Sequence, residues 1–534
     1  MNERDPAARV ATGPLHGEVA IAVSSHHLAS QAALDALSAG GNAVDAAIAA
    51  NGVLSVVLPD TCGVGGDLFA IVHTPGEVTP SALNASGRAG SAASAQRLRD
   101  EGHEGVPLRS VDSITVPGCI DGWEALIERH GQRSLADNLE AAIGYATDGF
   151  EVSTELASSL QRLQPIIGNQ PSAAALYPDG ISPKPGDIIT RPSLAATLTS
   201  VADGGRKAFY EGDVGRAITD VTGGIITPDD LRQIQAEWVD PLGAEIMGLT
   251  AWTIPPNSQG WVTLATLRIF ELLDPPSDPL DPAFHHAMIE AYRSVVWERD
   301  ATTSDPDTAP VDADELLDET SLAARAEQIS GSLAGKWPAA TSAPGGTTYL
   351  ATRDHAGMAV SLIQSNFRGI GTGLSAGATG VWLHDRGEGF DLEPGSPNEL
   401  TAGRRPLHTL APTLWTDGDA TALVLGTRGG DQQPQLLAQL AAHHRWADMC
   451  VEDAQLQPRW AIQDIADPEP VVHLESRFAP GTVEGLASRG HTLAEASAWE
   501  VGWGPVSALS VGADKRGGAD PRVSTTAALW AAAR

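Results

Sequence analysis

A flexible turn followed by a strand, at residues 344–353, constrains this chain more than any other stretch. Residues 344–346 are one proline and two glycines, which leave the backbone few side-chain restrictions. The run 347–353 is rich in β-branched and aromatic residues, and 358–365 repeats that pattern after a turn-like segment at 354–357. The sequence therefore predicts a β-hairpin with a glycine-rich entry.

The first residue after these glycines, Thr347, carries a hydroxyl group that has two possible uses. If the bond between Gly346 and Thr347 were cut, Thr347 would hold both an alcohol and a free α-amine. That amine, with an ordinary pKa of roughly 7.7–8.0, can act as the base for its own hydroxyl. The other interpretation is an ordinary hairpin, and this stretch alone leaves both open.

The charge of the chain narrows its possible partners. Its 34 basic and 67 acidic residues give a formal net charge of −33. Such a surface repels phosphate backbones and anionic membranes, so we expect neither nucleic acid nor a membrane as a partner. At 534 residues, the chain is long enough for two domains or lobes.

The remaining composition favours the cytoplasm. Residues 1–14 lack an apolar core preceded by basic residues, so no secretory signal is expected, and no apolar run is long enough to span a membrane. Three cysteines, Cys62, Cys119 and Cys450, are too few and too scattered for a disulfide framework and suit a reducing compartment.

Several further elements follow from apolar patterns and glycine or proline breaks. A strand at 19–23 leads into a helix that Ser24 or Ser25 can cap, and Asn42 and Asp45 can cap or pair at the next helix. Other expected helices are 123–129, 135–146, 321–329 and 436–444, and other expected strands are 68–72, 380–384 and 422–425.

No cofactor or metal site is expected. The glycine string 369–373 follows a strand but no amphipathic helix succeeds it, which argues against a dinucleotide site. The adjacent histidine pairs 26–27 and 443–444 cannot readily converge on one ion. Gly429 and Gly430 could offer backbone N–H groups to an oxyanion, or could simply form a turn.

Arg88 lies among alanine, serine and glycine, with no acidic neighbour in sequence. An isolated arginine is usually a solvated surface residue. Its planar fork is also suited to holding a carboxylate.

Taken together and in order, the motifs of the chain resemble those of the γ-glutamyltransferase family (γ-glutamyltranspeptidase, glutathione hydrolase), which belongs to the N-terminal-nucleophile hydrolases. The matching stretches are 29–30, 40–47, 63–67, 116–118, 122–123, 208–212, 223–224, 227, 230–231, 346–348, 405–407, 412–413 and 426–430.

The resemblance implies an α+β fold, an αββα sandwich built from two subunits of one precursor. The large subunit would be 1–346, with a connector at about 300–346, and the small subunit 347–534 would begin at the nucleophile. Cleavage between Gly346 and Thr347 would release Thr347. Its hydroxyl would then attack a small-molecule amide and form an acyl-enzyme that water or an amine acceptor resolves. A homo-oligomer is possible.

By position, the resemblance also assigns roles within the site. Gly429 and Gly430 correspond to the oxyanion hole, Ser365 to a second hydroxyl near the nucleophile, and Arg88 to the arginine that holds the substrate's α-carboxylate. Thr348 follows the nucleophile as in the family.

The departures concern substrate binding. Gly389 stands where the family has an acidic residue for the substrate's ammonium group, and Arg386 stands in place of a glutamine. His408 and Thr409 replace paired serines, and the family's asparagine corresponds to either Asn366 or Phe367. The loop 394–404 is short, so we expect no lid over the site.

A pocket with Arg88, and with Arg386 as a second candidate, that lacks an obvious acidic partner for ammonium favours an acyl group that carries a carboxylate, either γ-glutamyl or a related group. The resemblance is therefore nearer to the γ-glutamyltransferase-like branch. Oxamate and glutaryl amides, the substrates of the γ-glutamyltransferase-like branch, are the alternative without γ-glutamyl specificity. Glu388 could still restore ammonium binding. A different kind of alternative is an uncleaved, non-catalytic homologue.

Overall fold

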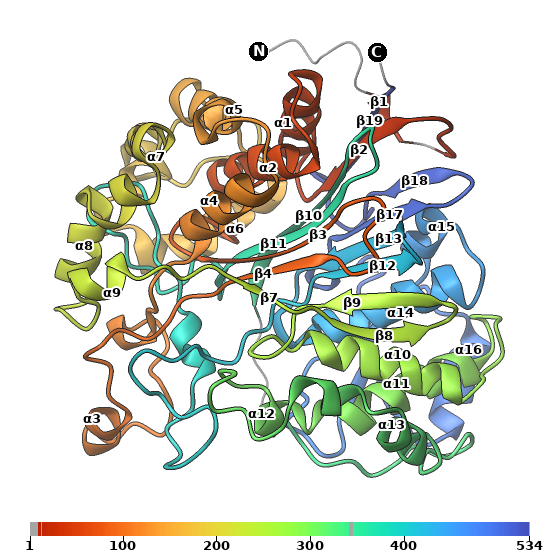
Figure 1. Cartoon of the computed structure of the whole chain (residues 1–534). Helices are drawn as coiled ribbons and strands as arrows, with labels where there is room; N and C mark the ends of the chain where they lie inside the picture. The colour runs from red at the N-terminus through yellow and green to blue at the C-terminus, as the bar shows by residue number, and fades with distance from the viewer. Residues whose placement is uncertain (1–8, 12, 341–344, 533–534) are drawn as a thin grey trace.

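Two antiparallel sheets lie face to face at the centre of the computed structural model, which describes residues 9–11, 13–340 and 345–532 (Figure 1). The first sheet has the order β1 (Arg9–Val10), β19 (Ala527–Ala532), β2 (Val19–Ser24), β10 (Gly346–Arg353), β11 (Ala359–Phe367), β3 (Asp67–His73), β4 (Ser81–Ala85) and β7 (Glu237–Val239). The second has the order β18 (Lys515–Gly518), β17 (Val506–Val511), β13 (Ala420–Thr427), β12 (Thr413–Asp417), β9 (Leu249–Thr253) and β8 (Leu242–Ile246).

Alternate residues of each strand pack in opposite directions, as the two-residue period of a strand requires. On β10, Tyr349 and Ala351 join the core between the sheets, where they meet Leu414 of β12 and Val424 of β13. Leu350, between them in sequence, belongs to a separate core under the helices. The central strands are therefore buried on both faces.

Helices cover both outer faces, so the layers run αββα (Figure 1). On the side of the first sheet lie α1 (His27–Ser38), α2 (Ala43–Val57), α4 (Cys119–His130), α5 (Leu135–Asp148), α6 (Thr154–Ile167), α7 (Pro192–Tyr210), α8 (Asp213–Val221) and α9 (Pro228–Arg232), of which α1, α2 and α4 make the main contacts with its strands. On the side of the second lie α10 (Gly260–Leu272), α11 (Pro282–Val296), α13 (Glu319–Ala326), α14 (Gln433–Arg445), α15 (Val451–Leu456) and α16 (Pro480–Ser488), of which α10, α14 and α15 make the main contacts with its strands.

The remaining elements are short helices and small sheets. They are α3 (Ala95–Asp100), α12 (Arg299–Thr302), the pair β5 (Phe150–Glu151) and β6 (Ile188–Ile189), and a sheet of β14 (Trp460–Ile462), β15 (Val471–Glu475) and β16 (Thr492–Ala496). Across the described ranges, no helix combines the length and the apolar character needed to cross a bilayer.

The predicted hairpin is confirmed as β10 and β11, which occupy the middle of the first sheet. β10 also pairs with β2, so segments from both sides of Thr347 share one sheet. The expected capping by Asn42 and Asp45 is likewise present at the start of α2.

Two local expectations are wrong. His26, not Ser24 or Ser25, caps α1, because its Nδ1 accepts the Leu28 N–H. Residues 380–384 form no strand: the N–H of Leu383 donates to Leu374 and that of His384 to Gly65, so their hydrogen bonds do not align into a ladder.

Candidate active site

Thr347 lies at the start of β10, buried beside the hydroxyl of Ser365 from β11. Its Oγ1 donates to Ser365 Oγ at 3.3 Å. Ser365 Oγ in turn donates to the Gly346 carbonyl oxygen at 2.6 Å and accepts the Phe367 N–H at 2.7 Å. An irregularity in the register between Gly346 and Thr348 accompanies this arrangement. The structure thus brings together Thr347, Ser365 and the carbonyl of the predicted cleavage point.

This geometry has a direct chemical use. A hydroxyl that donates to a carbonyl oxygen can stabilise negative charge that develops there during nucleophilic attack. Ser365 holds that position relative to Gly346, and the hydroxyl of Thr347 lies next to it.

The glycines around the predicted cleavage point lie close to the backbone of two other segments. A Cβ atom on Gly345 would lie 3.0 Å from Gly430 Cα, and one on Gly346 would lie 2.8 Å from Gly369 N. Gly429 and Gly430 have positive φ angles of 134° and 59°, which other residues rarely adopt. The structure therefore places Gly430 next to the segment that enters Thr347, as an oxyanion role would require.

Gln259, which the sequence analysis did not single out, holds this loop in place. Its Nε2 donates to the carbonyl oxygens of Thr409, at 2.8 Å, and Gly430, at 2.9 Å. Its Oε1 accepts a hydrogen bond from Arg299, which also pairs with Asp431 at 2.5 Å. The only signal in the sequence was its position directly before α10, which does not reveal long-range partners.

His408 is fully buried. Its Nε2 donates to Asp67 Oδ2 at 3.1 Å, and its Nδ1 accepts the Leu410 N–H at 3.3 Å. Burial lowers the pKa of His408 to about 3, so the ring is neutral. Both ring nitrogens therefore have partners within the protein, and a role of His408 in substrate binding stays a prediction.

Asp67 is the centre of this cluster. Burial alone would raise its pKa, but the charge and hydrogen bond of His384 and the hydrogen bond from His408 prevail and hold the pKa well below its usual range. Its other oxygen accepts the Gly87 N–H at 3.0 Å. Asp67 also pairs with Ser365 in the register of β3 and β11, so it connects the nucleophile region to the segment that carries Arg88.

Arg386 lies fully buried near Thr409 and Phe367. Its Nη1 donates to Thr409 Oγ1 at 3.2 Å, and its guanidinium carbon lies 3.9 Å from the centre of the Phe367 ring. Burial lowers its pKa to about 10, against the charges of Asp67 and other nearby carboxylates. Asn366, the residue before Phe367, is also fully buried.

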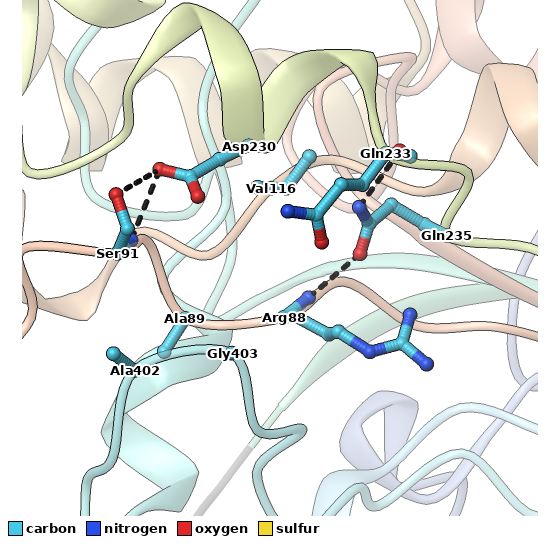
Figure 2. Close-up of a pocket in the computed structure, with 9 residues that line it drawn as sticks. All are labelled: Arg88, Ala89, Ser91, Val116, Asp230, Gln233, Gln235, Ala402 and Gly403. Carbon is cyan, nitrogen blue, oxygen red and sulfur yellow. Dashed lines mark hydrogen bonds between the residues drawn. The ribbon is translucent and has the colours of Figure 1, made fainter.

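Arg88 is less buried, with a side chain that is 22% exposed; Figure 2 shows its surroundings. Its backbone N–H donates to Gln235 Oε1 at 3.0 Å, and it lines a cavity of about 190 Å³. Figure 2 shows the guanidinium pointing away from Ser91 and Asp230 on the opposite wall. Its Nη2 pairs with Glu237 Oε1 at 2.8 Å, an acidic partner from β7 that the local sequence did not reveal.

The absence of an acidic side chain at position 389 has a steric reason. A Cβ atom on Gly389 would lie 2.5 Å from the Leu407 carbonyl oxygen. The alternative acid, Glu388, is paired with Arg368. Burial raises the pKa of Glu388 to about 7 despite that pairing.

Comparison with known proteins agrees with this geometry. The sequence profile of the γ-glutamyltranspeptidase family matches residues 29–530, so the chain belongs to that family and is an enzyme.

Three relatives cover nearly the whole chain. The glutathione hydrolase-like YwrD proenzyme of Bacillus subtilis is 34% identical over 516 residues, 95% of this chain and 97% of its own. The oxamate amidohydrolase proenzyme of Klebsiella pneumoniae is 34% identical, covering 89% and 91%. The crystal structure of a cephalosporin acylase from Bacillus halodurans superposes with a TM-score of 0.88 at 30% identity, covering 99% of both chains.

Proposed function

We propose that this protein is a self-processing amide hydrolase or acyltransferase with Thr347 as its nucleophile, acting on amides whose acyl group carries a carboxylate. The observation that carries the proposal is the hydrogen-bonded chain from Thr347 Oγ1 through Ser365 Oγ to the Gly346 carbonyl oxygen.

Self-processing would begin with attack of Thr347 Oγ1 on the Gly346 carbonyl carbon. The C–N bond between Gly346 and Thr347 breaks, the hydroxyl proton passes to the Thr347 nitrogen, and an ester forms. Water then hydrolyses the ester, which restores the Thr347 hydroxyl and leaves a carboxylate on Gly346. Ser365 Oγ–H would stabilise the charge on the carbonyl oxygen during the attack.

The released amine of Thr347 then serves the second reaction. It takes the proton of the Thr347 hydroxyl as that oxygen attacks a substrate amide, and the leaving amine departs with a proton. The acyl-enzyme is resolved by water or by an amine acceptor. The subunits 1–346 and 347–534 would stay together, because β10 and β11 pair with β2 and β3.

The carboxylate-bearing acyl group is supported by two findings. No acidic side chain fits at Gly389, so the usual ammonium partner is missing. The relatives include an oxamate amidohydrolase and a glutathione hydrolase-like proenzyme, which supports oxamyl and γ-glutamyl amides as candidates beside the glutaryl amides suggested by the sequence.

Denaturing electrophoresis of the purified protein tests the proposal. Wild type should give two fragments that meet at Thr347, and Thr347→Ala should give one full-length band without amidase activity. Thr352→Ala is the matched control, because this threonine of the same strand donates to the Ala43 carbonyl oxygen, away from the site. Thr352→Ala should still be cleaved; an uncut wild type that hydrolyses amides would refute the proposal.

A further inference from the structure

A buried glutamine from another segment holds the backbone of Gly430. Gln259 lies directly before α10, and its exposed fraction is 0%. Its Nε2 donates to the carbonyl oxygens of Thr409, at 2.8 Å, and Gly430, at 2.9 Å, and its backbone N–H donates to the carbonyl oxygen of His408 at 2.9 Å. One residue therefore ties the backbone of two other segments to the start of a helix.

The direction in which the Gln259 amide faces is set by Arg299. Arg299 Nη1 donates to Gln259 Oε1 at 3.2 Å. A guanidinium has no acceptor, and a carbonyl oxygen has no hydrogen to donate. An amide turned by half a rotation would place its NH2 group against Arg299 and its oxygen against two carbonyl oxygens. The observed orientation alone satisfies all three contacts.

Arg299 also restrains the residue that follows Gly430. Its Nη1 pairs with Asp431 Oδ1 at 2.5 Å, and the two side chains are 2% and 6% exposed. Burial alone would lower the pKa of Arg299, but Asp431 and Asp300 hold that pKa above its ordinary value. Separating two buried opposite charges is costly, so this pair keeps Asp431 in place.

Gly430 needs such restraints because its own backbone is permissive. Gly429 and Gly430 both have positive φ angles, a region that glycine enters and leaves freely. The Gln432 N–H donates to the Gly429 carbonyl oxygen at 3.0 Å, which fixes the peptide plane that carries the Gly430 N–H. Gln259 fixes the next plane through the Gly430 carbonyl oxygen. An oxyanion donor acts only within about 2.7–3.1 Å of the oxyanion, so both planes must be held.

The carbonyl at the predicted cleavage point has a different donor. Ser365 Oγ donates to the Gly346 carbonyl oxygen at 2.6 Å. Ser365 lies in β11, which is held by its pairing with β3 and β10. The donor directed at Gly346 therefore comes from the sheet, whereas Gly430 depends on Gln259 and Arg299.

We propose that Gln259 and Arg299 are positioning residues for acyl transfer from substrate amides. They hold the Gly430 N–H where the substrate oxyanion forms, while self-cleavage depends on Ser365 instead. This inference rests on the proposed function and adds to it two residues that act through Gly430.

Gln259→Met tests the inference, because methionine has a similar length but no amide group. Gln439→Met is the matched control. Gln439 of α14 is also buried, and its Nε2 likewise donates to two carbonyl oxygens, those of Gln435 and Trp460, at 2.9 Å each. Both variants lose two such hydrogen bonds, but only Gln259 holds Gly430.

Two reactions are measured for each protein. The first is the rate at which the small fragment appears after expression or refolding. The second is the turnover of γ-glutamyl-p-nitroanilide or glutaryl-p-nitroanilide, whichever wild type hydrolyses faster, with kcat and KM determined separately on cleaved protein.

We expect Gln259→Met to lower kcat roughly 30-fold, somewhat less than the complete loss of an oxyanion donor. KM should stay within about twofold, because the contact to the oxyanion exists only in the transition state. Self-cleavage should stay within about threefold of wild type, since Ser365 is untouched. Gln439→Met should keep both rates.

Arg299→Lys gives a second measurement if Gln259→Met yields no soluble protein. Lysine keeps the charge beside Asp431 but lacks the fork that reaches both Asp431 and Gln259. Turnover should fall about fivefold in kcat, again without a matching change in self-cleavage.

The outcomes separate this inference from the proposed function. Unchanged turnover in cleaved Gln259→Met or Arg299→Lys would overturn the positioning role and leave Thr347 as nucleophile. So would an equal loss in Gln439→Met, a change in KM alone, or self-cleavage slowed as much as turnover. A wild type that is uncut, or that hydrolyses neither p-nitroanilide, would count against the proposed function itself.

Discussion

Two arginines near the site differ sharply in their surroundings. Arg88 is partly exposed and paired with Glu237, whereas Arg386 is fully buried and stacked on Phe367, with two donors unused among the described residues. Because binding strength depends on desolvation and on free hydrogen-bonding groups, the same side chain has different capacities in these two places. We call the partly exposed surroundings of Arg88 the rim and the buried surroundings of Arg386 the floor.

The largest expected effect is that of Ser365→Ala on the rate of self-cleavage. Ser365→Ala removes the donor to the Gly346 carbonyl oxygen and should slow self-cleavage at least about 100-fold, the usual cost of one oxyanion donor. The measurement is the rate of appearance of the small fragment after expression or refolding. Ser361→Ala is the control, since this serine of the same strand contacts Tyr349 instead. Equal rates for both variants would remove Ser365 from the reaction.

The stability contributions of Glu388, on the floor, and Glu237, at the rim, should change with pH in opposite directions. Burial raises the pKa of Glu388 to about 7, so its contribution to stability is present below the ordinary value of about 4.5 and is lost as pH rises through 7. Relative to wild type, Glu388→Gln should therefore gain stability between pH 4.5 and 7, by at most about 3 kcal/mol.

At the rim, burial alone would raise the pKa of Glu237, but Arg405 and Arg88 lower it. Its contribution is present above pH 4.5 and is lost as pH falls through the lowered pKa. Glu237→Gln should thus be less stable than wild type near neutrality and should approach it in acid. Thermal unfolding of wild type, Glu388→Gln and Glu237→Gln across pH checks both directions. If the stabilities of all three changed with pH in parallel, the predicted difference between the two carboxylates would be wrong.

The smallest effect is expected from Arg88. Arg88→Gln should lower the discrimination between carboxylate and neutral substrates only about threefold, because an exposed, already paired charge contributes little. The assay is the ratio of kcat/KM for glutaryl-p-nitroanilide to that for butyryl-p-nitroanilide. A loss of about tenfold or more would show that Arg88 makes the main contact with the carboxylate.

The sequence predicted much of the fold, because local patterns carry that information. The alternation in 347–353 and the turn at 354–357 gave the hairpin, and the motif series gave a family that the comparisons confirm. The αββα layers expected from the resemblance are also observed. The strand expected at 380–384 was wrong because an apolar run does not reveal hydrogen bonds that diverge to Leu374 and Gly65.

The site was less predictable, because its properties depend on partners far away in sequence. Glu237 beside Arg88, and Gln259 beneath Gly430, come from segments that no local pattern connects to the site. The engagement of both His408 nitrogens is likewise invisible in sequence. The catalytic roles assigned to Thr347 and its neighbours remain predictions.

The mass of the mature chains tests the central claim most directly. Intact-protein mass spectrometry of active, purified wild type, combined with N-terminal sequencing, should find a small subunit that begins at Thr347 with an unmodified α-amine. An active protein with a single chain, uncut between Gly346 and Thr347, would contradict the account.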